Sequence, residues 1–460
     1  MGTEIRVRGA ADVTDAELHV YADGTSGDDA NDGRTAGTPK KTLAAVFDLI
    51  PEIIKHNTAV HLSGEFIDFG YWGPGSRIVM DGAYFIIDGG TDVTQVAGPF
   101  TATASDPSKL YLDVSGAGWT PDEYAGYWIE ITSGSQTGTQ LTIQENTIER
   151  IQVCKAFTAD PGLCDFRIVR PSTALIANTG SISFVLNGWH TDGWVVIQNL
   201  FLSSLNASRY AYFGAYYSKG RIGFTSVVTN VIDPAKNSVT CHNMDYAFFL
   251  DYYYNPNTFA VTSNIGRGLS ARVAGVSVAA ANTALIRSGY FSKCLLGSTG
   301  IGGPVSATYG IYYGARFKEL VLVGNKMNPS ALVNDHIVNT SGYSPTKISG
   351  SSGVGLTVDK SYLKIGPGVI IADNASHGIE LKNHSNLVLN GAVVGTGNAG
   401  AGVYAHTHSA VRTKAGSPPT LTGTIGDCST DGTTEATTWA DVEAGNPVSD
   451  LNEMTTIEAE

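Results

Sequence analysis

Charged residues are scarce in this 460-residue sequence, where Asp, Glu, Lys and Arg together make up only 15%. Lysine and arginine are absent after Lys414, and the formal net charge is −13. Nucleic-acid binding needs a basic stripe, so the acidic balance argues against a nucleic-acid partner. No apolar run reaches the length of a membrane span, and the N-terminus lacks a basic segment followed by an apolar one. We therefore expect neither membrane insertion nor a signal peptide.

Cysteines are few, odd in number and without the spacing of a metal site, which predicts reduced thiols in a protein that folds in a cytoplasm. The five are Cys154, Cys164, Cys241, Cys294 and Cys428. The sequence also lacks a Ser-His-Asp signature at a nucleophile elbow, a Walker loop and a Rossmann glycine fingerprint. We therefore expect no metal and no cofactor.

Residues 21–46, YADGTSGDDANDGRTAGTPKKTLAAV, contain four aspartates and four glycines. A calcium loop ending at Asp32-Gly33 needs oxygen ligands at alternating positions, but Ala30 stands where one is required. The cluster is therefore interpreted as a turn-rich connector and not as a metal loop.

A short amphipathic helix follows this connector. Thr38 can cap the helix, Pro39 suits its first position, and Pro51 ends it. Apolar residues at i, i+3, i+4 and i+7 predict one buried face. These residues are Leu43, Val46, Phe47 and Ile50.

Three segments near the C-terminus repeat one pattern: GVGLTVDKSYLKI, HGIELKNHSNLVL and AGVYAHTHSAVRT. Ser361, Ser385 and Ser409 recur every 24 residues, and glycines recur at nearly the same interval. Apolar residues alternate within each segment. A period of two inside such a repeat predicts the stacked rungs of a parallel β-helix, a solenoid. A β-sandwich is the rival fold, but the shared register of serine and glycine favours the solenoid.

Two other segments depart from this pattern. Residues 99–171 combine short strands, Gly-rich turns and their own aromatic residues, which predicts an inserted small β-barrel-like module. Its candidate core residues are Trp119, Tyr124, Trp128 and Phe157. Residues 427–460 carry nine carboxylates, and this composition predicts an extended or partly ordered tail, either solubilising or a docking segment for a neighbouring subunit.

The connector resembles the start of phage tail-spike and other pectate-lyase-like β-helix proteins, and GYWIEITSGSQTGTQLTIQENT looks like a small domain of phage virion proteins. The resemblance implies an all-β, right-handed parallel β-helix whose N-terminal helix caps the open end of the solenoid. It also implies a homotrimer on the phage particle. The predicted parts are a connector (1–37), the capping helix and first rungs (38–98), the inserted module (99–171), the β-helix (172–425) and the acidic tail (426–460).

Carboxylates on the outward face of the repeat are the first candidate site. Asp359 and Glu380 are expected on diagonal neighbours of adjacent rungs, about 7 Å apart. That separation suits the two acids of an inverting glycoside hydrolase. The alternative is an exposed ion pair between Asp359 and Lys382, which is common on strand faces. His384 and His408 are also expected to stack, but two histidines without a carboxylate are a weak metal site.

Tyrosine-rich segments are the second candidate site. Three segments are rich in tyrosine: YAYFGAYY (210–217), DYAFFLDYYY (245–254) and GIYYGARF (310–317). Such segments are suited to binding carbohydrate, because tyrosine rings stack on the faces of sugars and their hydroxyls form hydrogen bonds with sugar hydroxyls. An aromatic subunit interface is the equal alternative. The predicted carbohydrate-binding residues are Tyr212, Tyr216, Tyr252, Tyr254, Tyr312 and Arg316, with Asp245 and Asp251 as further candidate catalytic acids.

The resemblance implies a phage virion protein of the tail that contacts other virion proteins, and the tyrosine-rich segments suggest that it adheres to host surface polysaccharide. One alternative is a glycan depolymerase, a glycoside hydrolase on the same scaffold, so catalysis is left open. The other is a structural head or baseplate decoration without a ligand. The few residues before Tyr21 leave little room for a particle anchor, which favours the decoration. A pectate-type lyase is not expected, because clustered calcium-binding aspartates are missing.

Overall fold

A computed structural model describes the protein in two compact units. The N-terminal unit comprises residues 1–94 and 171–248, and the C-terminal unit comprises residues 95–170 and 249–460. The described residues are 14, 16–67, 78–79, 82–177, 182–187, 190–204, 211–216, 219–231, 237–242, 245–263, 286–298, 312–323, 337, 339, 341–389, 393–406, 409–413, 420–421, 425–428, 434–437, 449–450 and 455–459.

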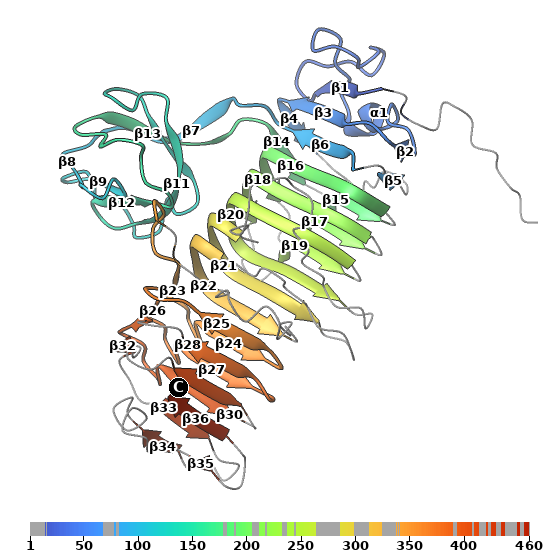
Figure 1. The fold of residues 1–460 in the computed structure, drawn as a ribbon. Helices are drawn as coiled ribbons and strands as arrows, with labels where there is room; N and C mark the ends of the chain where they lie inside the picture. The colour runs from blue at the N-terminus through green and yellow to red at the C-terminus, as the bar shows by residue number, and fades with distance from the viewer. Residues whose placement is uncertain are drawn as a thin grey trace, which may run out of the picture. The chain divides into compact units, whose positions relative to one another are not determined.

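Strands dominate both units (Figure 1), as the alternating sequence predicts, and α1 (Leu43–Phe47) is the one α-helix in the described part of the chain. None of the described helical structure is long and apolar enough to cross a membrane. The all-β prediction is therefore confirmed.

Parallel strands stack in register in the N-terminal unit. Val20, Val60, Ile87 and Ile197 align across β1, β3, β6 and β16, and all four side chains are buried. Buried and outward residues alternate along β1 and β6, so one face of these strands forms part of the core. The strands of this unit are β1 (Leu18–Asp23), β2 (Ile53–Ile54), β3 (Thr58–Ser63), β4 (Glu65–Ile67), β5 (Ile78–Val79), β6 (Tyr84–Asp88), β14 (Ala174–Ala177), β15 (Ile182–Asn187), β16 (His190–Ser204), β17 (Ala211–Tyr216), β18 (Lys219–Val231) and β19 (Asn237–His242).

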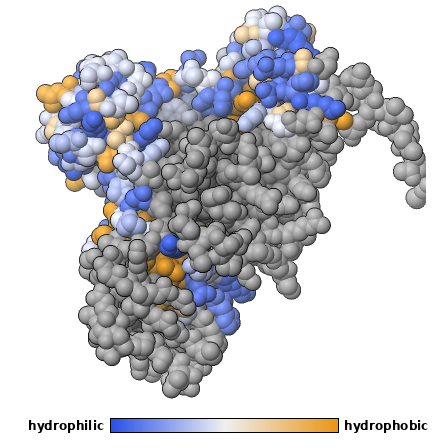
Figure 2. Space-filling model, in the orientation of Figure 1, coloured by the Kyte–Doolittle hydropathy of each residue, from blue (hydrophilic) through white to orange (hydrophobic). Residues whose placement is uncertain are grey.

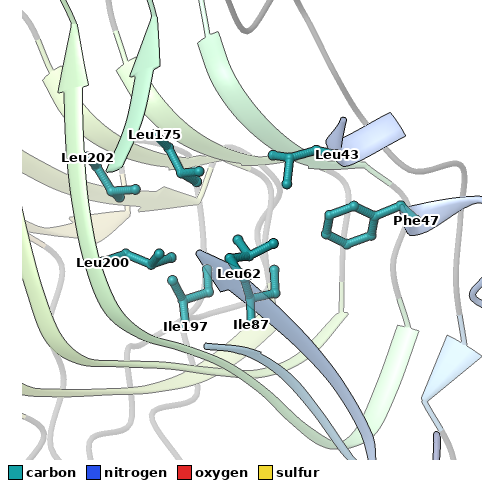
Figure 3. A pocket seen from close by; sticks show the side chains of 8 residues that line it. All are labelled: Leu43, Phe47, Leu62, Ile87, Leu175, Ile197, Leu200 and Leu202. Atoms are coloured by element: carbon teal, nitrogen blue, oxygen red, sulfur yellow. The ribbon is translucent and has the colours of Figure 1, made fainter. Parts of the chain in front are cut away.

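The predicted apolar face of the helix is confirmed, because Leu43, Val46, Phe47 and Ile50 are all buried. Leu43 and Phe47 point toward Leu62 and Ile87 across a small apolar pocket (Figure 3). The rest of its lining comes from β14 and β16: Leu175, Ile197, Leu200 and Leu202. The helix therefore covers apolar side chains of the stacked strands.

The predicted start of this helix was wrong. Thr42, and not Thr38, is the N-cap, and its hydroxyl accepts a hydrogen bond from the Ala45 amide at 3.2 Å. Thr38 instead donates its hydroxyl to Asp32 at 2.6 Å. The reason is a contact distant in sequence, since Asp29 accepts hydrogen bonds from the Lys41 amide and from the amide and hydroxyl of Thr42. Asp29 thereby fixes the residue at which the helix begins.

Acidification is expected to weaken this contact. Burial alone would raise the pKa of Asp29, but the hydrogen bonds from Thr42 and Lys41 outweigh it and lower the pKa. The stabilisation is therefore complete above the unfolded-state pKa of about 3.9 and disappears as the pH falls through the lower folded-state value. We expect Asp29→Asn to lower the free energy of unfolding by about 0.5–1 kcal/mol at pH 7, and this difference from wild type to shrink as the pH falls below the unfolded-state pKa of Asp29.

Urea denaturation of wild type and Asp29→Asn across pH 3–7 measures this difference. Asp28→Asn is the matched control, because Asp28 accepts a hydrogen bond only within its own turn, from the Ala30 amide. A stability difference for Asp29→Asn that is independent of pH would contradict the expectation.

The segment predicted as an inserted module forms a small antiparallel sheet with an apolar core. Its predicted aromatic residues Trp119, Tyr124, Trp128 and Phe157 are all buried. The ring of Trp119 packs edge-on against Tyr124, with centroids 5.9 Å apart. The strands are β7 (Val93–Thr101), β8 (Ala104–Ser105), β9 (Tyr111–Asp113), β10 (Trp128–Ile131), β11 (Gln140–Asn146), β12 (Arg150–Val153) and β13 (Asp165–Pro171).

The described residues of the C-terminal unit outside this module include parallel strands in three columns. One column is β23–β26–β29–β32, the second β24–β27–β30–β33 and the third β25–β28–β31–β36. The strands are β20 (Asp245–Ser263), β21 (Ile286–Ser298), β22 (Tyr312–Val323), β23 (Lys347–Ser349), β24 (Leu356–Asp359), β25 (Tyr362–Ile365), β26 (Ile370–Ala372), β27 (Ile379–Lys382), β28 (Asn386–Leu389), β29 (Val394–Gly395), β30 (Val403–His406), β31 (Ala410–Thr413), β32 (Thr420–Leu421), β33 (Ile425–Cys428) and β36 (Thr455–Ala459).

The repeating serines form a buried ladder between the second and third columns. The Ser361 amide donates to the Ser385 hydroxyl and the Ser385 amide to the Ser409 hydroxyl, both at 3.2 Å. Lys360 and His384, which precede two of these serines, have positive φ values of 47° and 63°. The 24-residue repeat of the sequence is therefore a repeated corner between two strands.

The acidic tail continues two of these columns. Strand β33 pairs parallel to β30, and β36 pairs parallel to β31. Strands β34 (Thr434–Thr437) and β35 (Ser449–Asp450) then pair antiparallel to β33 and β36. These antiparallel pairs end the parallel stacking at this end of the unit.

Candidate functional site

Polar and aromatic residues gather on the outward face of the second column. Thr357, Glu380 and Tyr404 align across β24, β27 and β30, and Asp359 lies opposite Lys382. The residues directly before them on each strand, Leu356, Ile379 and Val403, point inward and are buried, as the alternation predicts. The core packing thus fixes the spacing of the outward groups.

The two candidate acids have different partners. Oε2 of Glu380 lies 2.8 Å from Nζ of Lys382, and the two side chains are 12% and 39% exposed. Asp359 accepts a hydrogen bond from Nδ2 of Asn383 at 2.8 Å. Lys382 therefore pairs with the carboxylate two residues before it on the same strand face.

A histidine that sequence reasoning missed completes this face. The rings of His377 and Tyr404 stack with centroids 4.2 Å apart and planes 9° apart. Nδ1 of His377 accepts a hydrogen bond from the Ala401 amide at 2.9 Å, which fixes the ring. The one available signal was its position directly before Gly378 of the repeat.

This arrangement is suited to binding a polar ligand. The stacked rings supply an apolar surface for a sugar, and the Glu380–Lys382 pair supplies an acceptor and donors for its hydroxyls. Acid–base hydrolysis needs one protonated and one ionised carboxyl flanking the scissile bond. Because Asp359 and Glu380 are both engaged by neighbouring donors, the geometry fits binding better than proton transfer.

Figure 2 shows hydrophilic residues with small, separate hydrophobic patches on the face in view. Large exposed apolar side chains among the described residues are scattered along the chain: Ile67, Val96, Ile148, Leu163 and Val394.

Arg316 occupies a buried ion-pair cluster. Its guanidinium contacts Asp122 and lies 3.1 Å from Oε2 of Glu145, and its side chain is 8% exposed. Lys347 lies 2.8 Å from the same Glu145 oxygen. Burial alone would lower the pKa of Arg316, but Asp122 and Glu145 outweigh it and raise the pKa. The cluster joins the inserted module to β22 and β23.

The structure places the other predicted residues on strands. Tyr254 aligns with Tyr290 and, one strand further, with Arg316, while Asp251 aligns with Arg287. Asp245 and Tyr252 lie on β20, Tyr312 lies on β22, and Tyr212 and Tyr216 lie on β17. The side chains of the five predicted tyrosines (Tyr212, Tyr216, Tyr252, Tyr254 and Tyr312) and of Asp245 and Asp251 lie outside what the structure describes, as does His408. Their roles stay predictions.

No group of three or more His, Cys, Asp or Glu side chains in the described residues is arranged to hold a metal ion. The cysteines whose side chains the structure describes, Cys154 and Cys164, are buried and form no disulfide within the described residues. Burial, followed by the nearby Asp165 and Asp160, raises the pKa of Cys164 to about 11. Cys164 is therefore a protonated thiol at neutral pH.

Comparisons with known proteins give weak structural similarity only. No protein-family model and no curated protein match the sequence. A GH136 lacto-N-biosidase from Eubacterium ramulus has a TM-score of 0.23 and 11% identity over 88% of this chain. A tailspike of Acinetobacter baumannii bacteriophage AP22, in complex with capsular saccharide, has a TM-score of 0.18 and 12% identity over 80% of this chain. The tailspike of Pseudomonas phage phi297 has a TM-score of 0.21 and 10% identity over 81%.

The chain spans 65%, 63% and 69% of the lengths of these three proteins, respectively. With TM-scores this low, the similarities assign no activity to this chain.

Proposed function

We propose that this chain is a tail-spike-type protein of a bacteriophage particle that adheres to a host surface glycan. The proposed scaffold is a right-handed parallel β-helix that assembles as a homotrimer with other virion proteins. The resemblance of residues 21–46 to the start of such proteins supports the particle and the assembly. The in-register parallel columns and the 24-residue serine ladder support the scaffold.

The single observation that carries the glycan proposal is the outward cluster of His377, Tyr404, Glu380 and Lys382. An aromatic stack beside an ion pair offers one apolar surface and several hydrogen-bonding groups within two adjacent strands. This combination is typical of small-molecule and sugar sites, where a few polar groups orient a ligand on an apolar surface. The buried strands beneath hold these groups in place before any ligand arrives.

Purified protein is incubated with a panel of bacterial surface polysaccharides, and both binding and released oligosaccharide are measured. We expect binding without fragment release. Tyr404→Ala should weaken binding about 3- to 10-fold, because it removes one stacking partner. Glu380→Gln should weaken it about 10-fold or more, because a charged hydrogen-bond acceptor is lost.

Tyr362→Ala is the matched control, because Tyr362 lies on β25 in the third column. Equal binding losses from Tyr362→Ala and Tyr404→Ala would contradict the site. Fragment release that Asp359→Asn or Glu380→Gln abolishes would establish the depolymerase instead. Binding to no glycan in the panel would overturn the adhesion proposal and favour the structural virion role.

A further inference from the structure

The charged side chains on the outward face of the second column sum to one negative charge. Strands β24 and β27 carry Asp359, Glu380 and Lys382 as their charged residues. Oε2 of Glu380 and Nζ of Lys382 lie 2.8 Å apart, so these two charges neutralise each other. Asp359 lies opposite Lys382 but accepts its hydrogen bond from the neutral amide of Asn383. The charge of Asp359 is therefore not compensated within the two strands, and the nearby Lys360 belongs to the corner that leads to the third column.

The aromatic stack beside these groups adds no positive charge. Nδ1 of His377 accepts a hydrogen bond from the Ala401 amide, so this nitrogen keeps its lone pair. An imidazole that accepts at Nδ1 carries its proton at Nε2 and is neutral. The ring of His377 stacks on Tyr404, and Tyr404 aligns with Glu380 across β30 and β27. A ligand that contacts the stack therefore lies beside a carboxylate, and the described side chains of β24, β27 and β30 offer it no uncompensated cation.

An anionic sugar could bind Lys382 only by separating it from Glu380. The Glu380 side chain is 12% exposed, so its carboxylate would be poorly hydrated without the ammonium. The anionic group would also meet the charge of Asp359, and like charges repel more strongly in a partly buried site than in bulk water. An anionic glycan is therefore disfavoured both by the loss of an existing ion pair and by repulsion.

A neutral sugar leaves the ion pair intact and can contact both of its members. The carboxylate of Glu380 accepts from one hydroxyl, and the ammonium of Lys382 donates to a neighbouring hydroxyl. Because Oε2 and Nζ lie only 2.8 Å apart, the pair suits two hydroxyls on adjacent carbon atoms of one sugar ring. The face thus offers contacts to a vicinal diol that an anionic group could obtain only by breaking the pair.

We propose that this face selects neutral glycans with vicinal hydroxyls and rejects glycans that carry uronic acids or other anionic groups. The inference rests on the proposed glycan adhesion and names the chemical class of the glycan. The selection comes from the charge of Asp359 and from the Glu380–Lys382 pair that exists before a ligand binds.

Each neutral polysaccharide of the panel that binds is oxidised at its primary hydroxyls to the uronate, and the affinity of the full chain for both forms is measured by calorimetry at pH 7.5. We expect the oxidised form to bind about 10-fold or more weakly, because like charges are brought together. The ratio should shrink when NaCl is raised from about 20 mM to about 500 mM, because salt screens the repulsion. Methyl esterification of the uronate, which removes its charge, should restore binding.

Glu380→Gln separates the selection from a general loss of binding, because it releases Lys382 from its pair. The affinity for the neutral form should fall about 10-fold, whereas the affinity for the oxidised form should rise. A misfolded variant cannot produce these opposite changes. Asp359→Asn should narrow the ratio between the two forms. Asp28→Asn is the matched control, because it makes the same charge change at an exposed aspartate of the N-terminal unit and should leave the ratio unchanged.

Equal or tighter binding of the oxidised form by wild type would overturn the selection for neutral glycans and leave glycan adhesion itself in place. Binding of acidic polysaccharides alone within the panel would do the same. A parallel loss of both forms in Glu380→Gln, or an equal change of the ratio in Asp359→Asn and Asp28→Asn, would overturn the assignment to this face. Binding of neither class would overturn the proposed adhesion and, with it, this inference.

Discussion

Arg316→Ala should destabilise the C-terminal unit by about 3–5 kcal/mol, the largest loss that we expect from one substitution in this protein. The substitution removes the cation that lies between Asp122 and Glu145. These carboxylates are only 20% and 17% exposed, so water cannot fully replace the guanidinium. Lys347 would still neutralise Glu145, whereas Asp122 would retain only the more distant Lys318 at 3.7 Å.

The effect should concentrate where the inserted module meets the parallel strands. Gln144 of the module donates to the Pro345 carbonyl at 3.0 Å, and Ser344 donates to the Val153 carbonyl at 2.7 Å. These contacts and the Arg316 cluster depend on the same placement of the inserted module against β22 and β23. Urea denaturation measures the free energy of unfolding, and limited proteolysis tests whether the module becomes accessible before the rest of the unit.

Arg150→Ala is the matched control, because Arg150 also makes a two-point contact with an aspartate, Asp113, at 2.6 and 2.9 Å. The two side chains are 43% and 30% exposed, so we expect a loss of about 1 kcal/mol or less. Similar losses from Arg316→Ala and Arg150→Ala would contradict the argument, because burial would then not decide the cost.

Ser385→Ala should lower the free energy of unfolding by about 2 kcal/mol, a large effect for the removal of one oxygen atom. The buried hydroxyl accepts from the Ser361 amide at 3.2 Å and lies within hydrogen-bond distance of the Lys382 and Val358 carbonyls, at 2.5 and 2.9 Å. Alanine leaves a buried amide without its acceptor, and that desolvation penalty exceeds the value of an average hydrogen bond.

Hydrogen exchange provides a local measurement of this effect alongside chemical denaturation. The Ser361 amide should exchange faster in Ser385→Ala than in wild type, whereas amides of the inserted module should exchange as before. Ser352→Ala, at an exposed serine in the same unit, should change stability by less than about 0.5 kcal/mol. Unchanged protection of the Ser361 amide would show that its hydrogen bond to Ser385 contributes little to stability.

Much of the strand pattern could be predicted from the sequence because it depends on local periodicity. Alternation placed Leu356 and Val358 inward, and the structure buries both. The alignment of the repeat segments predicted that Asp359 lies opposite Lys382, and the two residues are paired in register. The spacing of apolar residues also identified the buried face of α1, although its start depended on the distant Asp29.

The contacts between outward polar side chains could not be predicted from this periodicity. His377 meets Tyr404, and Lys382 pairs with Glu380 and not with Asp359, because side-chain reach and corner geometry decide which neighbours touch. Arg316, a predicted sugar ligand, contacts Asp122, which lies 194 residues earlier in the chain. His19 and His61 meet across 42 residues.

The sequence by itself determined which side of each strand is buried, because the burial of apolar side chains is the main driving force of folding and repeats at every second residue. Only the tertiary structure decided which polar side chains meet. Such contacts depend on the register between segments far apart in the chain, and polar residues on an exposed face carry no periodic signal that would reveal it.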